Sequence, residues 1–316
     1  MNKHVVVVGS FIVDLMSQTI RMPFVGETVT GRFKMGPGGK GFNQAVAASR
    51  AGSNVIMVVK VGVDMFAEIA IDNFKREGFG LEYCFRDSSL HTGVAHIIVN
   101  ADGDNMIVVC PGANEALSID EVERAAGAIA NSAVLLVQLE ANLETTMHAV
   151  ELASRAGVMI VLNPAPAREF DISFLEKVDI ITPNETEAEH ITGIPVKSIN
   201  DAQRAGTRLL DMGVKAAIIT LGAKGALLSM PSRSVHIPPP TVPVVDTTGA
   251  GDAFNGGLVT ALVEGKGLEE AVVFANLVGA LSTTEIGTAP AMPTREEINA
   301  LGSRLNHKGI IRERRY

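Results

Sequence analysis

The regular alternation of strand and helix patterns between residues 119 and 220 constrains the fold of this chain more than any other feature. Short apolar runs typical of buried strands alternate there with longer segments of helical periodicity. The expected helices are 119–130, 143–156, 185–191 and 201–212, and the expected strands are 133–139, 158–162, 180–182 and 216–220. Repeated strand–helix–strand units predict a parallel sheet with helices on both faces.

The flanking segments extend this pattern and add a second one. Further buried strands are expected at 5–8 and 55–61, and further helices at 41–50, 66–77, 250–263 and 268–282. The stretches 27–35, 93–99 and 105–110 instead alternate apolar and polar residues, which is typical of antiparallel strands. We therefore expect a single three-layer α/β/α domain over 1–316, with a mostly parallel central sheet. A small β-sheet lid would be formed by inserted segments at about 11–36 and 91–110.

The expected lid carries a consequence for assembly. A small sheet set apart from the core has edges and an outer face that need covering, commonly by a second subunit. We expect a homodimer that forms through the lid.

The composition narrows the class of protein further. The 316 residues are 47% hydrophobic and carry a formal net charge of −8, which disfavours a surface that binds nucleic acid or anionic lipid. No stretch reaches the roughly 18 uncharged apolar residues needed to cross a bilayer. Cys84 and Cys110 are too few for a disulfide framework and lack metal-ligand spacing. We expect a cytoplasmic protein that acts on small molecules, with no nucleic-acid or membrane partner.

The stretch 244–254 is the strongest candidate for chemistry. Gly249, Ala250 and Gly251 let the backbone pass close to a ligand at a helix start, where free N–H groups attract an anion. Asp252 follows in the first turn, so an acid would lie beside a bound phosphate, which is an arrangement suited to phosphoryl transfer. An ordinary capped helix start has the same local sequence, and other segments must decide between the two interpretations.

Two more segments carry candidate ligand-binding residues. Asp14 lies just beyond the strand at 5–8, and ligands gather at the carboxyl ends of strands in parallel sheets, although turn chemistry also favours an acid there. In the glycine-rich stretch 36–41, Gly39 permits close approach of a ligand to the backbone. Lys40 and Asn43 offer hydrogen-bond donors, and a plain loop with a helix cap is the alternative.

Four segments together resemble the motifs of the ribokinase-like carbohydrate kinases. They are GPGGKGFN at 36–43, QLE at 138–140, TPNETE at 182–187 and DTTGAGD at 246–252, and their order and separations fit as well. The resemblance runs from residue 5 to about residue 293. The stretches 163–168 and 184–189 are particularly similar to ribokinases, and 13–28 is also similar to deoxyribokinases.

The resemblance implies a role for each matching residue. Asp252 would be the base that takes the proton from the sugar hydroxyl, with the amides of Gly249, Ala250, Gly251 and Asp252 holding the charge that develops on the phosphate. Asp14, Gly39, Lys40, Asn43, Glu140 and Asp252 would bind the sugar. Asn184, Thr220, Gly222, Gly225, Gly251 and Asn276 would bind ATP. Glu187 would position Mg²⁺ through water, and Asp246, Thr248, Ser282, Glu285 and Gly287 would surround an activating K⁺.

The implied activity is ATP-dependent transfer of the γ-phosphate to the terminal hydroxyl of a pentose. D-ribose, giving ribose 5-phosphate, is the first expectation, and 2-deoxyribose or another sugar or nucleoside is the alternative. The chain departs from the usual ribokinase pattern at Phe11 and Phe42, larger residues that we expect beside the sugar. Glu285 stands where ribokinases can carry a basic residue, which weakens the match at the K⁺ site.

Two other functional classes fit this sequence less well. A dinucleotide-binding dehydrogenase is excluded because the strand at 5–8 is not followed by a Gly-x-Gly-x-x-Gly fingerprint. A catalytically silent sugar or nucleoside sensor on the same scaffold stays open, since a fold does not fix a function, but Asp252 and both neighbouring glycines argue against it. The seven histidines are not spaced as metal ligands, and the basic tail at 307–316 is interpreted as a frayed terminus.

Overall fold

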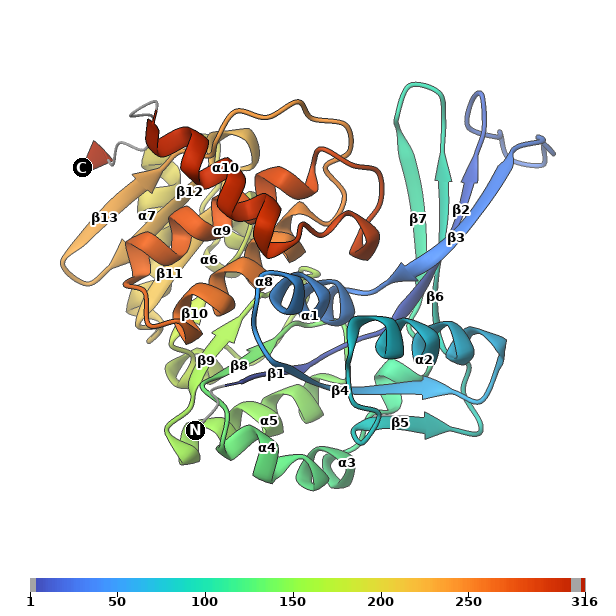
Figure 1. The fold of residues 1–316 in the computed structure, drawn as a ribbon, viewed down its shortest axis with the longest axis horizontal. Coiled ribbons are helices and arrows are strands. Elements are labelled where there is room, and N and C mark those ends of the chain that lie inside the picture. Colours follow the sequence, from blue (N-terminus) through green and yellow to red (C-terminus); the bar gives the residue numbers. More distant parts are fainter. Residues whose placement is uncertain (1–3, 308–313, 316) are drawn as a thin grey trace.

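The computed structural model describes residues 4–307 and 314–315, in which ten strands form a central sheet (Figure 1). Their order is β14-β13-β12-β11-β10-β9-β8-β1-β4-β5. The strands are β1 (Val5–Val8), β4 (Val55–Gly62), β5 (Cys84–Asp87), β8 (Val134–Val137), β9 (Met159–Leu162), β10 (Ile180–Ile181), β11 (Ala216–Thr220), β12 (Ala226–Met230), β13 (Arg233–Ile237) and β14 (Arg314–Arg315). From β11 to β5 all neighbours are parallel, whereas β11 to β14 pair antiparallel at one edge.

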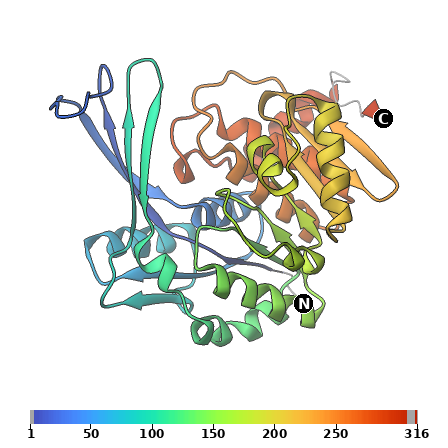
Figure 2. The ribbon, with the colours of Figure 1, turned by 180° about the vertical axis from the view of Figure 1, so that it is seen from behind.

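Two layers of helices cover this sheet, as the sequence predicts, and Figures 1 and 2 show them from opposite sides. One layer holds α1 (Lys40–Arg50), α2 (Met65–Glu77), α8 (Ala250–Val263), α9 (Leu268–Ser282) and α10 (Arg295–His307). The other holds α3 (Ile119–Arg124), α4 (Ala126–Ala130), α5 (Leu143–Ala156), α6 (Glu185–Thr192) and α7 (Ile199–Asp211). The four valines of β1 explain the arrangement, since Val5 and Val7 pack into the first layer and Val6 and Val8 into the second.

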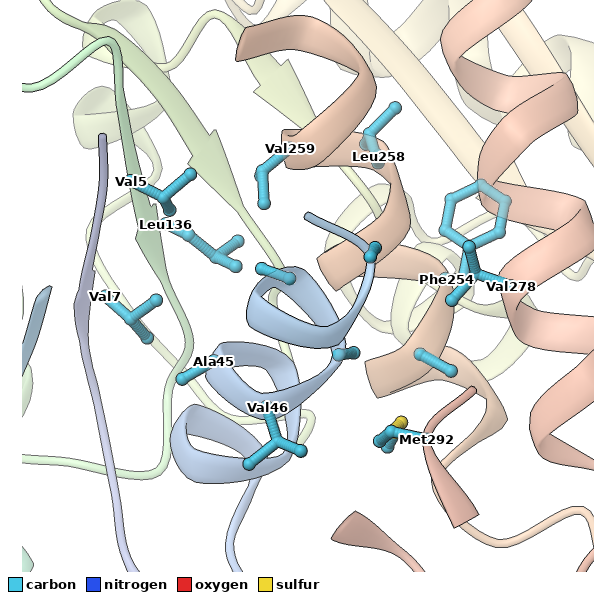
Figure 3. Close-up of a cluster of buried hydrophobic side chains, with 14 of the residues drawn as sticks. Val5, Val7, Ala45, Val46, Leu136, Phe254, Leu258, Val259, Val278 and Met292 are labelled. Atoms are coloured by element: carbon cyan, nitrogen blue, oxygen red, sulfur yellow. The ribbon is translucent and has the colours of Figure 1, made fainter. Parts of the chain in front are cut away.

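Helix α1 packs between β1 and α8, and this packing sets the geometry of the site (Figure 3). Small residues make the close approach possible. A Cβ atom on Gly256 of α8 would lie 2.4 Å from the Cβ of Ala47, and one on Gly257 would lie 2.7 Å from Cγ2 of Val278 in α9. Both glycines are therefore required by packing, and α8 is held firmly between its two neighbouring helices.

A second sheet of four strands stands apart from the core, in the order β3-β2-β6-β7 (Figure 1). Its strands are β2 (Ile12–Gln18), β3 (Arg32–Gly38), β6 (Gly93–Val99) and β7 (Asn105–Cys110). The central pair β2 and β6 is parallel, and each edge strand pairs antiparallel with its neighbour. The predicted α/β fold with a separate small sheet is confirmed.

Several boundaries differ from the sequence expectation. The helix expected at 119–130 is divided into α3 and α4 at Ala125, and the strand expected from residue 27 begins only at Arg32. The elements β5, β13 and α10 were not predicted. Strands β5 and β13 have only four and five residues, too few for a clear period, whereas the spacing of Ile298, Leu301 and Leu305 in α10 was a usable helical signal. Short 3₁₀ helices complete the chain: η1 (Gly112–Ala116), η2 (Ile172–Lys177), η3 (Gly222–Lys224) and η4 (Ala289–Ala291).

The basic tail predicted to be frayed, 307–316, lies largely outside the described residues, which here include His307 in α10 and the pair forming β14. Throughout the ranges 4–307 and 314–315, no helix combines the length and apolarity that a membrane crossing requires.

Candidate active site

The first turn of α8 is the centre of the candidate site. Gly249 caps the helix in the left-handed conformation, with φ 78°, which any side chain would disfavour. The N–H group of Ala250 donates to the carbonyl of Thr247 at 3.2 Å. Gly251 and Asp252 therefore supply the amide donors at this helix end, because the first N–H groups of a helix have no partner within it.

Gly251 differs from the other glycines of α8. A Cβ atom built on it would meet nothing within 4 Å, and its φ lies outside the positive region that favours glycine. Neither packing nor backbone conformation therefore requires a glycine there, in contrast to Gly256. A ligand that approaches the backbone closely does require one, as expected for a phosphate at a helix N-terminus.

The carboxylate of Asp252 is only 7% exposed and is held from two sides by α1. Asn43 Nδ2 donates to its Oδ2 at 2.9 Å, and Gln44 Nε2 donates to its Oδ1 at 2.9 Å. These donors are uncharged amides, so they orient the carboxylate without neutralising it. A direct cationic partner acts differently, as at Glu27, where the hydrogen bond from Arg21 helps lower the carboxyl pKa to about 2.

The predicted sugar-binding residues gather on the lid side of Asp252. Glu140 Oε2 accepts hydrogen bonds from the hydroxyl of Ser10 at 2.5 Å and from the backbone N–H of Lys40 at 2.7 Å. Gly39, the N-cap of α1, has φ 90°, and its hypothetical Cβ would lie 2.8 Å from the backbone nitrogen of Ile12. The sharp turn that brings Lys40 to Glu140 therefore needs a glycine.

Asp14 projects from β2, directly opposite Gly36 of β3. A Cβ atom on Gly38 would lie 2.5 Å from its Oδ2, so glycine leaves the space that the carboxylate occupies. Thr288 lies at 3.5 Å from the same oxygen and donates to the carbonyl of Pro37 at 3.2 Å. This contact joins the lid strand β3 to the segment that follows α9.

Electrostatics links the charged residues of the site. Burial, reinforced by the nearby carboxylate of Glu140, raises the pKa of Asp14 to about 6. Burial alone would lower the pKa of Lys40, but the carboxylates of Asp252, Glu140 and Glu187 outweigh it and raise the pKa. Lys40 is therefore a cation that feels acidic groups from three different segments.

The predicted nucleotide-side residues lie at the far ends of β10 and β11. Asn184 caps α6 and forms a capping box with Glu187, in which Asn184 Oδ1 accepts from the Glu187 N–H at 2.8 Å and Glu187 Oε2 accepts from the Asn184 N–H at 2.9 Å. Thr220 pairs with Asn184 across a parallel bridge. Burial raises the pKa of Glu187.

The chemistry of this pair suits a hydrated magnesium ion. The second carboxylate oxygen of Glu187 is outside the capping box, and a carboxylate oxygen is a hard ligand that can hold magnesium through water. No group of three or more His, Cys, Asp or Glu side chains in the described ranges is arranged as a metal cage.

The loop after β11 contains two more of the predicted ATP-binding residues, and a third, Asn276 of α9, contacts the neighbouring strand end. Gly222 and Gly225 both have positive φ, 53° and 87°, and a Cβ on Gly225 would lie 2.2 Å from the carbonyl oxygen of Ile237. That same oxygen accepts a hydrogen bond from Asn276 Nδ2 at 3.0 Å. Asn276 thus ties α9 to the end of β13, beside the glycine loop.

The residues predicted around a monovalent cation come from the loop before α8, the end of α9 and the loop after α9. Asp246 accepts from the N–H and the hydroxyl of Thr248 at 2.9 and 2.7 Å, and from the N–H of Gly287 at 3.0 Å. These hydrogen bonds outweigh the effect of burial and lower the pKa of Asp246. Ser282 is buried and donates to the carbonyl of Gly279 at 2.9 Å, whereas Glu285 is exposed.

The expected position of two phenylalanines beside the sugar is wrong. Phe11 and Phe42 are 0% and 1% exposed, so neither offers a surface that a ligand could touch. Their rings instead pack edge to face at 5.1 Å, and Phe42 stacks on Phe74 of α2 at 5.6 Å. The bulk at these positions serves the core between α1 and α2, and sequence alone could not give the direction of the side chains.

Several residues of the site were missed by the sequence analysis. Ser10, Gln44 and Asn163 are buried polar residues that contact site residues directly or through one another. Gln44 and Asn163 stand in or beside recognised motifs, and this was the signal that could have pointed to them. Thr288 gave no sequence signal.

The sequence pattern of the pfkB family carbohydrate kinases matches residues 2–295, and the chain belongs to that family. It is 42% identical to the deoxyribokinase of Salmonella typhi over 297 residues, 93% of this chain and 97% of that protein. It is 41% identical to the ribokinase of Haemophilus influenzae over 301 residues, 94% and 97% of the two chains. A ribokinase of Arabidopsis thaliana complexed with ribose and ATP superposes with a TM-score of 0.88 at 30% identity, covering 95% and 99%. The predicted family is confirmed, and the chain is an ATP-dependent sugar kinase.

Proposed function

We propose that this enzyme transfers the γ-phosphate of ATP to the terminal hydroxyl of a pentose, with D-ribose as the preferred acceptor. The observation that carries the proposal is the position of Asp252. Asp252 lies in the first turn of α8, at the glycine-rich helix start, and its carboxylate interacts electrostatically with Asp14 and with Lys40, which both also interact with Glu140. A base between an alcohol site and an anion site is what phosphoryl transfer to a hydroxyl requires.

The reaction follows from these positions. The sugar hydroxyl gives its proton to the Asp252 carboxylate while its oxygen forms a bond to the γ-phosphorus, and the bond from that phosphorus to the β–γ bridging oxygen breaks to release ADP. The amides of Gly251 and Asp252 stabilise the charge on the transferred group. Lys40, whose raised pKa keeps it charged, counters the negative charge of the acidic groups around it.

The sugar is held by Asp14, Glu140, Lys40 and Asn43 in this proposal. The Oδ1 atom of Asn43 is buried and accepts no hydrogen bond from the described part of the chain, which supports a role as acceptor from a sugar hydroxyl.

In this proposal ATP lies against Asn184, Thr220 and the loop from Gly222 to Gly225, with Asn276 near the adenine ring. Mg²⁺, when bound, neutralises phosphate charge, and Glu187 would hold it through water. The loops that carry Asp246 and Gly287 would hold K⁺.

The choice of sugar is tested by coupled ADP release with D-ribose, 2-deoxyribose, fructose, adenosine and 2-keto-3-deoxygluconate. We expect the highest kcat/KM with ribose, because the carboxylates of Asp14 and Glu140 favour a sugar that offers more hydroxyl donors than 2-deoxyribose. The nearly equal identities to a deoxyribokinase and a ribokinase make 2-deoxyribose the second candidate. A higher kcat/KM with 2-deoxyribose would overturn the ribose assignment, and no release with any acceptor would favour a silent sensor.

We further propose that the enzyme is a homodimer joined through the lid. The sheet face that carries Asp14 continues outward as an apolar strip, because Met16, Ile97, Ile107 and Val109 alternate onto that face by the pairing register. Ile107 and Val109 are 53% and 44% exposed on the edge strand β7. Exposed apolar edge strands favour pairing with another chain.

The lid dimer is tested by sedimentation at micromolar concentration. Lysine substitution of Ile107 should give monomers, whereas Val108→Lys, on the opposite face of the same strand and 63% exposed, should leave the dimer intact. A wild-type protein that sediments only as monomer would contradict the proposal. With both cysteines unpaired, we propose that the enzyme works in the reducing cytoplasm.

A further inference from the structure

A chain of buried amides runs beneath Asp252, and nothing in the proposed reaction uses it. Gln44 donates to Asp252 Oδ1 at 2.9 Å and to Asn163 Oδ1 at 3.0 Å, and its own Oε1 accepts from Gln138 Nε2 at 2.7 Å. Asn163 Nδ2 donates in turn to the carbonyl of Thr182 at 2.9 Å. Gln44 and Gln138 are 0% exposed, so neither touches a ligand.

The orientation of each amide in this hydrogen-bond series is set by the carbonyl of Thr182 at one end. The carbonyl oxygen of Thr182 can only accept, so the amide nitrogen of Asn163 must face it and the Asn163 oxygen must face Gln44. The nitrogen of Gln44 is then turned toward Asp252, and both of its hydrogens are used. Reversal of any one amide would place donors against donors or acceptors against acceptors in a buried environment.

A second arm starts at the same residue. The hydroxyl of Thr182 donates to Asn255 Oδ1 at 2.6 Å, and Asn255 Nδ2 donates to the carbonyl of Gly251 at 2.8 Å. The carbonyl of Gly251 and the N–H of Asp252 belong to one planar peptide group. Holding the carbonyl therefore also holds the amide that would face the transferred phosphate.

We propose that Gln44 and Asn255 are positioning residues that fix, respectively, the carboxylate and the backbone amide of Asp252 from a common anchor at Thr182. The inference rests on the proposed function and adds to it two residues that act on the base without touching substrate. Thr182 directly follows β10, and its N–H donates to the carbonyl of Leu162 in β9 at 2.9 Å, so the anchor is attached to the central sheet and not to the small one.

Charged groups also surround the base and must be accounted for in any pH experiment. Lys40 of α1, Asp14 of β2 and Glu187 of α6 all interact electrostatically with Asp252. None of them accepts from or donates to Gln44, whose three partners are Asp252, Asn163 and Gln138. Substitution of Gln44 therefore leaves those charges in place and changes one hydrogen bond to the carboxylate.

The test is the pH profile of kcat for Gln44→Met and Gln44→Glu, measured with saturating sugar and ATP. Loss of a hydrogen bond to the charged form makes the carboxylate easier to protonate, so the acidic limb of kcat should move up by about one pH unit in Gln44→Met. The maximal kcat should fall about 10- to 100-fold, the usual worth of a hydrogen bond to a charged group. Sugar KM should change less than about threefold, because Gln44 has no surface for a ligand. Gln44→Glu, which adds an acid, should move the limb further.

Asn255→Leu gives a contrasting signature. It should lower kcat by about tenfold or more with the acidic limb unmoved, because it removes the side-chain hydrogen bond to the Gly251 carbonyl and leaves the Asp252 carboxylate bonded to its two amide partners from α1. Asn73→Leu is the matched control. Asn73 is a buried amide of α2 that donates to the carbonyl of Ile69 and makes no hydrogen bond to any of the described residues of the site. Its loss should lower thermal stability without changing kcat or the acidic limb of the pH profile.

A Gln44→Met enzyme whose pH profile superimposes on the wild type would overturn the inference, even if its melting temperature fell. If that variant does not fold, Gln44→Glu and Asn255→Leu decide the matter by the same readouts. Wild-type protein that turns over no sugar would overturn the proposed function and this inference together. An active wild type with an unmoved limb in Gln44→Met would overturn the inference alone.

Discussion

The two sides of Asp252 are built from different materials. Toward the lid, the site consists of charged side chains, with Asp14, Lys40 and Glu140 partly buried and the carboxylate of Glu140 helping to raise the pKa of both Asp14 and Lys40. On the side proposed for the nucleotide, it consists of backbone, with Gly249 and Gly251 at a helix start. The sugar has hydroxyls that must be distinguished individually, whereas a phosphate is recognised well by amides and a helix end. Mutations on the two sides should therefore fail in different ways.

The largest expected effect comes from Asp252, which belongs to both sides. Asp252→Asn keeps the shape but removes the proton acceptor, so turnover should fall by roughly 10²–10⁴-fold, the usual worth of a positioned base. Sugar and ATP affinities, measured by calorimetry, should stay close to wild type. Unchanged turnover would remove Asp252 from the role of base.

The glycine-rich helix start is tested by adding one methyl group at Gly251. Gly251→Ala should lower turnover about 10²–10³-fold, because the methyl group displaces the phosphate from its donors, while the melting temperature stays the same or rises. Gly256→Ala, in the same helix, should instead lower the free energy of unfolding by about 1–3 kcal/mol, because it overpacks α1. Equal stability losses in both variants would break the contrast between the two glycines.

The charged side should respond to pH. In the proposed site Asp14 accepts sugar hydroxyls as a carboxylate, so kcat/KM for sugar should fall as the pH drops through about 6, its raised pKa. Asp14→Asn should raise sugar KM about 10- to 100-fold and remove this dependence. A sugar KM equal to wild type would take Asp14 out of the pocket.

For the stability of the fold, Asp14 should have the opposite effect: a falling pH should lower activity but raise stability. The pKa of Asp14 is raised from 3.8 in the unfolded chain to about 6 in the folded one, so the folded state binds the proton more tightly. Its charged form therefore destabilises the fold above pH 6, and this cost disappears as the pH falls toward 3.8. Asp14→Asn should melt at a higher temperature than wild type at pH 8, and the gain should vanish near pH 4 in calorimetric scans.

The smallest effect is expected at Ser10. Its hydroxyl donates to Glu140 at 2.5 Å, but the residue is 0% exposed and cannot touch sugar. Ser10→Ala should raise sugar KM roughly three- to tenfold through a less well oriented Glu140, with kcat little changed. An effect on kcat larger than that on KM would show that Ser10 acts on the phosphate side of Asp252 and not on the sugar side.

Much of this molecule could be predicted because local patterns and tertiary demands agree. The valine run 5–8 could only be a strand buried on both faces, and the small residues of 250–263 were suited to a packed helix. Asp252 and its glycines were recognisable because a phosphate-binding helix start needs those residue types in a fixed order. The break at Ala125 and the late start of β3 were missed, since boundaries depend on packing rather than on composition.

The sequence by itself determined the layers, the separate small sheet and the acid at the helix start, because hydrophobic period and glycine placement act over a few residues. Only the tertiary structure decided which way side chains point. It turned Phe11 and Phe42 into the core, gave Gln44 a place beneath the base, and brought Thr288 to Asp14 across 274 positions of sequence. Those outcomes depend on how helices and strands pack against one another, and no local pattern encodes that geometry.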